Sequence, residues 1–193
     1  MSVINVPQIT LVRHGETAWS LSGRHTGRTD IPLTPAGESA ARTLATRLAG
    51  GTYSAIWSSP SKRAMTTCAL SGFGTGSAIM PDLAEWDYGA YEGRTTKEIL
   101  TERPDWRLFR DGCPGGETVA DVGARADRII VQIRALDANV VIFSSAHVLR
   151  VLAARWIGLP PEDGALLVLG TASVSVLSYE HDHSEPVLRA WNG

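Results

Sequence analysis

The chain has 193 residues, of which 44% are hydrophobic and 20% are charged. This length suits one domain, 1–193, with a sizeable core, and the composition is that of an ordinary globular protein. Lysine and arginine (18) nearly balance aspartate and glutamate (20), so no basic face for nucleic acid is expected. We expect no secretion signal from the opening residues, which lack a charged and then apolar stretch, and no apolar run reaches the roughly 20 residues that span a bilayer. We therefore expect a cytoplasmic protein with neither nucleic-acid nor membrane partners.

Short apolar runs alternate along the chain with segments of helical periodicity. Strands are predicted over 8–12, 53–58, 139–144, 173–179 and, at a sheet edge, 186–191. Helices are predicted from Thr34-Pro35 to Gly50-Gly51, from Ser59-Pro60 to Leu70, and over 96–102, 117–136 and 147–157. The rest of 82–115 is expected to be irregular. This order predicts an α/β fold, a three-layer α/β/α sandwich around a mainly parallel sheet.

Three of the predicted strands end in polar, ionisable residues. Arg13 and His14 follow the first strand, the segment 58–63 follows the second, and 144–147 follows the third. Sites in open α/β sheets form in the crevice beyond the carboxyl ends of the strands. We expect these three segments to meet there.

Arg13, His14 and Arg63 together predict a site for phosphoryl transfer. A neutral imidazole is available near pH 7 and can attack phosphorus through one ring nitrogen. Guanidinium groups match the geometry of phosphate and stay charged throughout the reaction. Such a site is expected to need neither a metal ion nor another cofactor.

Glu85, in the segment LAEWDYGAYEG, is the candidate general acid. A leaving alkoxide needs a proton, and a carboxyl group is able to supply it. The neighbouring Trp86, Tyr88 and Tyr91 predict partial burial, which disfavours the charged form of a carboxyl and keeps it protonated for longer.

Four blocks of sequence carry a resemblance to a known family. LVRHGETAWS, followed by GRHTGRTDIPLTPAGE, resembles the signature opening of the histidine phosphatase (phosphoglycerate mutase-like) superfamily. WSSPSKRAMTTC, LAEWDYGAYEGR and the segment beginning GGETVADVGARAD resemble the later blocks in order, so the resemblance covers most of 8–158. Within the superfamily, HVLRVLAARWIGLP resembles bacterial phosphatases that act on small sugar or glycolytic phosphates.

The resemblance implies a phosphoglycerate mutase-like fold and a role for individual residues. His14 would be the nucleophile that becomes a phosphohistidine, and Arg13 and Arg63 would hold the phosphate. Glu85 would donate a proton to the leaving group and later activate water. The substrate pocket would be lined by Thr26, Gly27 through its backbone, Tyr88, and Ser20, which stands where many members carry asparagine.

One position departs from the family's pattern. Members usually carry a His-Gly pair five residues before an arginine, and counting back from Arg150 places Ser145 and Ala146 there, with His147 two residues later. In the family that second histidine contacts the transferring phosphoryl group. Two alternatives follow: His147 bends in to bind the phosphate, or Ser145 supplies an uncharged hydrogen bond at a cost of roughly 10²-fold in rate.

The predicted function is hydrolysis of small phosphomonoesters, sugar or glycolytic phosphates among them, by a metal-independent acid-type phosphatase. A phosphoglycerate mutase is one alternative, although the segment 92–115 is shorter than in cofactor-dependent mutases and lacks their paired arginines. A catalytically weakened phosphate-binding protein is the other, because of Ser145. Glu85 favours the enzyme, since a protein that only binds phosphate needs no general acid.

Overall fold

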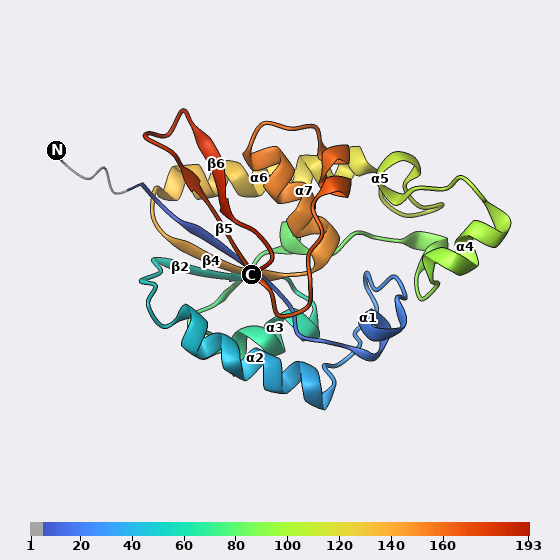
Figure 1. Ribbon diagram of the computed structural model, residues 1–193, viewed down its shortest axis with the longest axis horizontal. Helices are drawn as coiled ribbons and strands as arrows, with labels where there is room; N and C mark the ends of the chain where they lie inside the picture. Colours follow the sequence, from blue (N-terminus) through green and yellow to red (C-terminus); the bar gives the residue numbers. More distant parts are fainter. Residues whose placement is uncertain (1–5) are drawn as a thin grey trace.

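The computed structural model describes residues 6–193 as alternating strands and helices (Figure 1). The strands are β1 (Ile9–Arg13), β2 (Ala55–Ser58), β3 (Ala78–Ile79), β4 (Val140–Ser144), β5 (Val174–Tyr179) and β6 (Pro186–Ala190). The α-helices are α1 (Ala18–Ser22), α2 (Pro35–Leu48), α3 (Lys62–Leu70), α4 (Thr96–Glu102), α5 (Leu108–Asp111), α6 (Val119–Leu136) and α7 (Ala146–Trp156). Short 3-10 helices are η1 (Pro81–Leu83), η2 (Gly89–Tyr91) and η3 (Pro161–Leu166). No helix in this described part of the chain is long and apolar enough to cross a membrane.

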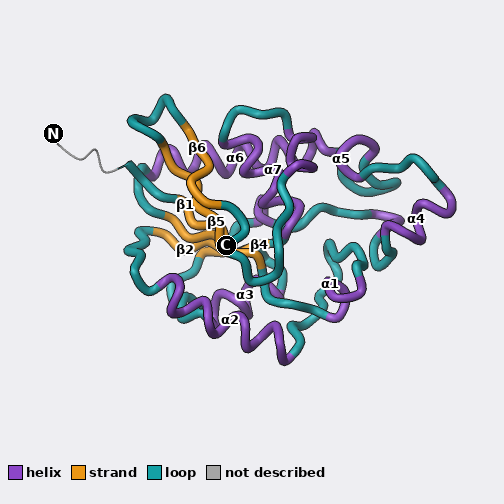
Figure 2. The backbone as a smooth tube through the Cα atoms, viewed as in Figure 1, coloured by secondary structure: helices purple, strands orange, loops and turns teal. Residues whose placement is uncertain are grey.

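The strands form one sheet in the order β3-β2-β4-β1-β5-β6 (Figure 2). The first four strands in this order are parallel, whereas β5 runs antiparallel to β1, and β6 antiparallel to β5. Because β1 and β2 flank β4 and run in its direction, their carboxyl ends meet at one edge of the sheet. The mainly parallel sheet predicted from the sequence is confirmed.

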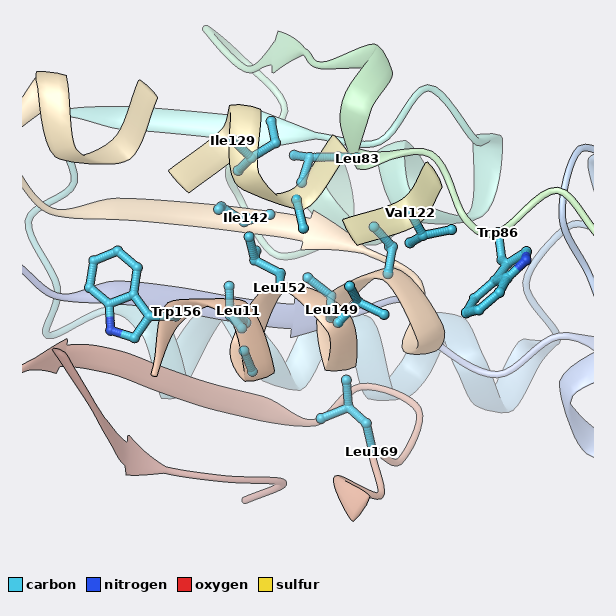
Figure 3. Close-up of a cluster of buried hydrophobic side chains, with 14 of the residues drawn as sticks. Leu11, Leu83, Trp86, Val122, Ile129, Ile142, Leu149, Leu152, Trp156 and Leu169 are labelled. Atoms are coloured by element: carbon cyan, nitrogen blue, oxygen red, sulfur yellow. The ribbon is translucent and has the colours of Figure 1, made fainter. Parts of the chain in front are cut away.

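Alternating residues of the central strands bury the two faces of the sheet. Val12, Val141 and Phe143 pack in a cluster with residues of α2 and α3. Val140 and Ile142 pack in a second cluster with residues of α6 and α7. Figure 3 shows part of the second cluster, with Leu11 and Ile142 of the sheet beside Ile129 of α6 and Leu149 of α7. The two helical layers lie on opposite sides of the sheet in Figure 1, so the predicted three-layer sandwich is also confirmed.

The differences from the sequence-based prediction lie in short elements. The helices α1 and α5 and the two-residue strand β3 were not predicted. Helix α3 begins at Lys62 and not at Pro60, because the N–H of Ser59 still donates to Phe143 O in the sheet (2.9 Å). The chain therefore leaves the strand two residues later than the Ser-Pro pair suggested.

The RHGE and LTPAGE blocks meet backbone to backbone between β1 and α2. Thr34 caps α2 by accepting a hydrogen bond from Gly37 N (3.0 Å), and its hydroxyl donates to the carboxylate of Glu16 (2.7 Å). A Cβ atom added to Gly15 would lie 2.4 Å from Gly37 O, and one added to Gly37 would lie 2.2 Å from Glu16 O. This close approach requires glycine at both positions and fixes the loop that follows β1.

We expect Gly37→Ala to destabilise the protein by about 2 kcal/mol or more, since overpacking against backbone atoms leaves no flexible side chain to yield. The matched control is Gly50→Ala, where an added Cβ has no atom within 4 Å, and its effect should stay within about 0.5 kcal/mol. Urea denaturation of both variants measures the difference. Equal stabilities would show that the two blocks do not need this contact.

Candidate active site

A pocket of about 240 Å³ brings together three segments that are far apart in the sequence. It lies beyond the carboxyl ends of β1 and β4, and we call it the His14 pocket. Its walls come from 13–26, 85–96 and 146–147, which include these predicted site residues: Arg13, His14, Ser20, Thr26, Glu85, Tyr88 and His147. The ends of β1 and β4 thus meet at this pocket as expected, whereas the segment 58–63 is not among its walls and reaches the site through the contact of Arg63 with Ser145.

The imidazole of His14 is buried and only 4% exposed. Its Nδ1 lies 2.7 Å from Gly15 O, and because a carbonyl oxygen only accepts, Nδ1 carries the ring proton. The lone pair is thus left on Nε2. Burial, followed by the charges of Arg63 and Arg13, lowers the pKa of His14 to about 3. The ring is therefore neutral at pH 7 and has a lone pair that is able to attack an electrophile.

Arg63, in the first turn of α3, is fully buried and held by backbone carbonyls. One terminal nitrogen, Nη1, donates to Thr29 O (3.1 Å), and Nη2 donates to Thr26 O (2.9 Å) and Gly27 O (3.0 Å). Nη2 also lies 3.3 Å from the hydroxyl of Ser145. These contacts fix the plane of the guanidinium group, and its Nε has no hydrogen-bond partner among residues 6–193.

Arg13 is fixed in a similar way at the end of β1, where its Nη1 donates to Leu169 O (2.5 Å). Across residues 6–193, the Nε atoms of Arg13 and Arg63 are the two buried side-chain nitrogen or oxygen atoms without a hydrogen-bond partner. Neither arginine forms an ion pair in that range. Burial lowers the pKa of both groups, although a guanidinium stays charged at neutral pH. Two unpaired cationic donors beside a neutral imidazole form a site for an anion.

Glu85 lies at the start of α7 and accepts three backbone hydrogen bonds. Its Oε1 accepts from the N–H groups of Trp86 and Val148 (both 2.9 Å), and its Oε2 accepts from the N–H of His147 (3.0 Å). The carboxylate thus caps α7 from another segment of the chain. Glu85 is buried, as predicted, and Tyr88 lines the His14 pocket with it, whereas Trp86 and Tyr91 pack into the core.

Ser145 and His147 lie in different parts of the site. Ser145 is 1% exposed and contacts Arg63 through its hydroxyl. His147 Nδ1 lies 2.5 Å from the hydroxyl oxygen of Tyr88. Burial lowers the pKa of His147 well below its usual value and raises the pKa of Tyr88, so the Tyr88 hydroxyl donates to a neutral imidazole. The structure thus places Ser145, and not His147, beside the second arginine.

Two of the predicted substrate contacts have their polar groups engaged within the protein. The N–H of Gly27 donates to the carboxylate of Glu92 (2.9 and 3.0 Å), and Gly27 O accepts from Arg63, so both backbone polar groups of Gly27 already have partners within the protein. The hydroxyl of Ser20 donates to Thr17 O (3.0 Å), which closes the first turn of α1. Thr26, by contrast, lines the His14 pocket.

Sequence reasoning missed several residues of the pocket. Arg24, His25 and Thr96 line it without being among the predicted site residues. Glu92 binds the N–H groups of Gly27 and Thr29 and so shapes the loop over Arg63. Its place in the DYGAYEG segment was the one available signal, whereas nothing in the sequence distinguishes Arg24 or Thr96 from other surface residues.

Comparison with known proteins assigns this architecture to a family. The profile of the histidine phosphatase superfamily (branch 1) matches residues 9–192. The chain belongs to this superfamily. An acid phosphatase of Mycobacterium tuberculosis is 40% identical over 179 residues, which cover 90% of this chain and 87% of that protein. Sedoheptulose 1,7-bisphosphatase of Saccharomyces cerevisiae is 36% identical over 186 residues, covering 79% of this chain and 68% of the relative.

A solved structure shows the same fold over almost the whole chain. The structure of an open reading frame of Mycobacterium tuberculosis superposes with a TM-score of 0.91 at 36% identity, covering 96% of this chain and 97% of the other. The histidine phosphatase superfamily and its phosphoglycerate mutase-like fold, both predicted from the sequence, are thereby confirmed.

The buried histidines of this histidine phosphatase should make its stability fall as the solution becomes acidic. Burial lowers the pKa of His25 from 6.5 to about 4. The unfolded chain therefore binds a proton there first, and stability is lost between about pH 6.5 and pH 4. On acidification, the free energy of unfolding of His25→Gln should therefore fall by on the order of 2 kcal/mol less than that of the wild type.

The control for this prediction is His181→Gln. His181 is exposed and Glu185 raises its pKa, so protonation of this ring does not favour unfolding at acid pH. Urea denaturation at pH 7 and near pH 4.5 gives the change for each protein. If His25→Gln loses as much stability on acidification as the wild type, His25 is not buried as a neutral ring.

Proposed function

We propose that the chain is a metal-independent, acid-type phosphatase that hydrolyses small phosphomonoesters through a phosphohistidine at His14. The observation that carries the proposal is the neutral imidazole, with its Nε2 lone pair, beside the unpartnered Nε–H groups of Arg13 and Arg63. The names of the two relatives, an acid phosphatase and a sugar bisphosphatase, support the same reaction class.

In the first step, Nε2 of His14 attacks the phosphorus atom of the ester. A P–N bond forms, the ester P–O bond breaks, and its electron pair leaves with the alkoxide, which takes a proton from Glu85. Arg13 and Arg63 hold the non-bridging oxygens through their Nε–H groups, where guanidinium charge stabilises the transition state. The three backbone N–H donors then stabilise the Glu85 carboxylate that remains.

In the second step, the Glu85 carboxylate accepts a proton from a water molecule whose oxygen attacks the phosphorus. The P–N bond breaks, its electron pair returns to Nε2 of His14, and inorganic phosphate is released. Glu85 again carries its proton, so acid and nucleophile are both regenerated. One carboxyl group thus acts as acid and then as base.

Ser145 makes this site weaker in charge than one with a second histidine. Its hydroxyl offers a neutral hydrogen bond next to Arg63, so the two arginines carry the cationic stabilisation of the phosphoryl group. We expect the missing charge to lower the rate of hydrolysis. We do not expect a protein that only binds phosphate, because Glu85 also lines the His14 pocket. Sugar and glycolytic phosphates are the first class of substrates to test.

Hydrolysis of an aryl phosphate in the presence of a metal chelator tests the mechanism. We expect turnover by the wild type and a loss of at least about 10³-fold in His14→Ala, because the nucleophile is removed. His181→Ala, on the exposed turn between β5 and β6, is the control and should retain full activity. Absence of turnover in the wild type would favour a phosphate-binding protein, and phosphoryl transfer to a second metabolite without release of phosphate would favour a mutase.

The pH dependence of kcat tests the protonation states. His14 stays neutral down to about pH 4, because its pKa is lowered to about 3. Because the imidazole stays neutral over this range, kcat should show no decline centred near pH 6.5 as the pH falls from 8 towards 5. We use kcat because it is independent of the ionisation of free substrate. A loss of activity centred near pH 6.5 on acidification would show that His14 titrates as an ordinary histidine.

A further inference from the structure

A second cavity of about 370 Å³ adjoins the His14 pocket. Three residues, His25, Thr96 and His147, line both spaces. We call this cavity the aromatic chamber, and its remaining walls are mainly apolar residues from α4 to α5: Leu100, Pro104, Trp106, Leu108 and Phe109. In Figure 1 this part of the chain extends to one side of the sheet.

The aromatic rings of the chamber pack edge to face. The Trp106 ring lies 5.7 Å from His25 at an interplanar angle of 80°, and the Phe109 ring lies 5.5 Å from His147 at 69°. The Nε1–H of Trp106 is already used, because it donates to Gly112 O (2.8 Å). The ring of Trp106 therefore presents apolar carbon, and not its hydrogen-bond donor, to the chamber.

The chamber walls carry little charge. Burial lowers the pKa of His25 to about 4 and that of His147 well below its usual value, so both rings are neutral at pH 7. The charged residues of the chamber, Asp105 and Arg107, are exposed. A polyol placed inside would give up hydrogen bonds to water and find few in return, whereas an apolar group would gain by leaving water.

We propose that the aromatic chamber binds the alcohol portion of the substrate and selects phosphomonoesters whose alcohol carries a flat aromatic or apolar group over esters of polyols. The inference rests on the proposed function, since it assumes that the phosphoryl group sits against His14. The shared walls give the geometric reason: an ester oxygen in the His14 pocket, beside Glu85, has the rings of His25 and His147 next to it. The same two rings also line the aromatic chamber.

The test compares 2-phenylethyl phosphate with glycerol 1-phosphate. Both release an alkyl alcohol, so their intrinsic reactivities are similar and the ring is the main difference. We expect kcat/KM to favour the phenylethyl ester by roughly 10- to 100-fold, the range given by burial of one aromatic side chain. Equal values, or a preference for glycerol 1-phosphate, would overturn the chamber proposal while leaving the phosphatase proposal intact.

Two variants connect the preference to the chamber. Leu100→Gln on α4 and Pro104→Ser on the exposed rim should each reduce the preference several-fold, with turnover of glycerol 1-phosphate as the internal reference. The matched control is Lys97→Gln, an exposed residue of α4 outside the chamber walls, which should keep the preference unchanged. An undiminished preference in both chamber variants would contradict the proposal.

Binding of non-hydrolysable phosphonates separates failure of the chamber from failure of the catalytic mechanism. We expect calorimetry to show that benzylphosphonate binds roughly 10-fold or more tightly than methylphosphonate. If neither ester is hydrolysed but this ratio is found, the proposed catalysis is wrong and the chamber stands as a binding subsite. Equal affinities would overturn the chamber whether or not the esters are hydrolysed.

Discussion

The charge of two fixed guanidinium groups, with no carboxylate paired to either, determines how the rest of the site is built. Arg13 and Arg63 direct their terminal nitrogens at backbone carbonyls, which satisfy hydrogen bonds without cancelling the charge. The unpartnered Nε atoms are left for a bound anion. The same charges help to keep His14 neutral. Two fixed cations beside one neutral imidazole are therefore in place for a phosphate group before any substrate arrives.

The arginines bind backbone carbonyl groups, and three carboxylates bind the N–H and hydroxyl donors around the site. Glu16 accepts from Thr34, Glu92 accepts from the N–H groups of Gly27 and Thr29, and Glu85 accepts from the first turn of α7. Each acidic residue thus fastens a loop and does not neutralise an arginine of the pocket. The loops over Arg63 are in this way fixed by side chains of opposite charge that bind opposite ends of the peptide group. Such an arrangement orients the groups of the site and leaves the positive charges of Arg13 and Arg63 available to an anion.

Much of the architecture was predictable because it depends on local periodicity and on strand ends. The apolar run of β4, the helical pattern of α6 and the RHGE block gave the layers and the position of His14. The shorter elements were missed, since α1 and α5 depend on tertiary contacts more than on propensity. The backbone donors around Glu85 were also missed, because two of them belong to the first turn of α7, which only the fold brings beside this carboxylate.

The residues that line the aromatic chamber also depend on tertiary contacts that the sequence does not reveal. Trp106 and Phe109 lie in a segment that the sequence left as irregular, and their role as walls depends on how that segment folds over His25 and His147. Ser145 was recognised from its spacing to Arg150, but its contact with Arg63 requires the approach of α3 to the start of α7. Spacing in the sequence can identify a substitution, whereas only the fold shows what the new side chain touches.

The cap that Glu85 forms on α7 links the chemistry of the site to the order of a helix. In the proposed mechanism this carboxyl gains and loses a proton in each turnover. The protonated form is a poorer hydrogen-bond acceptor, so the first turn of α7 would be held less firmly until the proton is given away. The rate at which the amide hydrogens of His147 and Val148 exchange with solvent should therefore depend on whether Glu85 is protonated. Removal of Glu85 would loosen this turn as well as take away a proton donor, so an inactive Glu85 variant has two physical causes to separate.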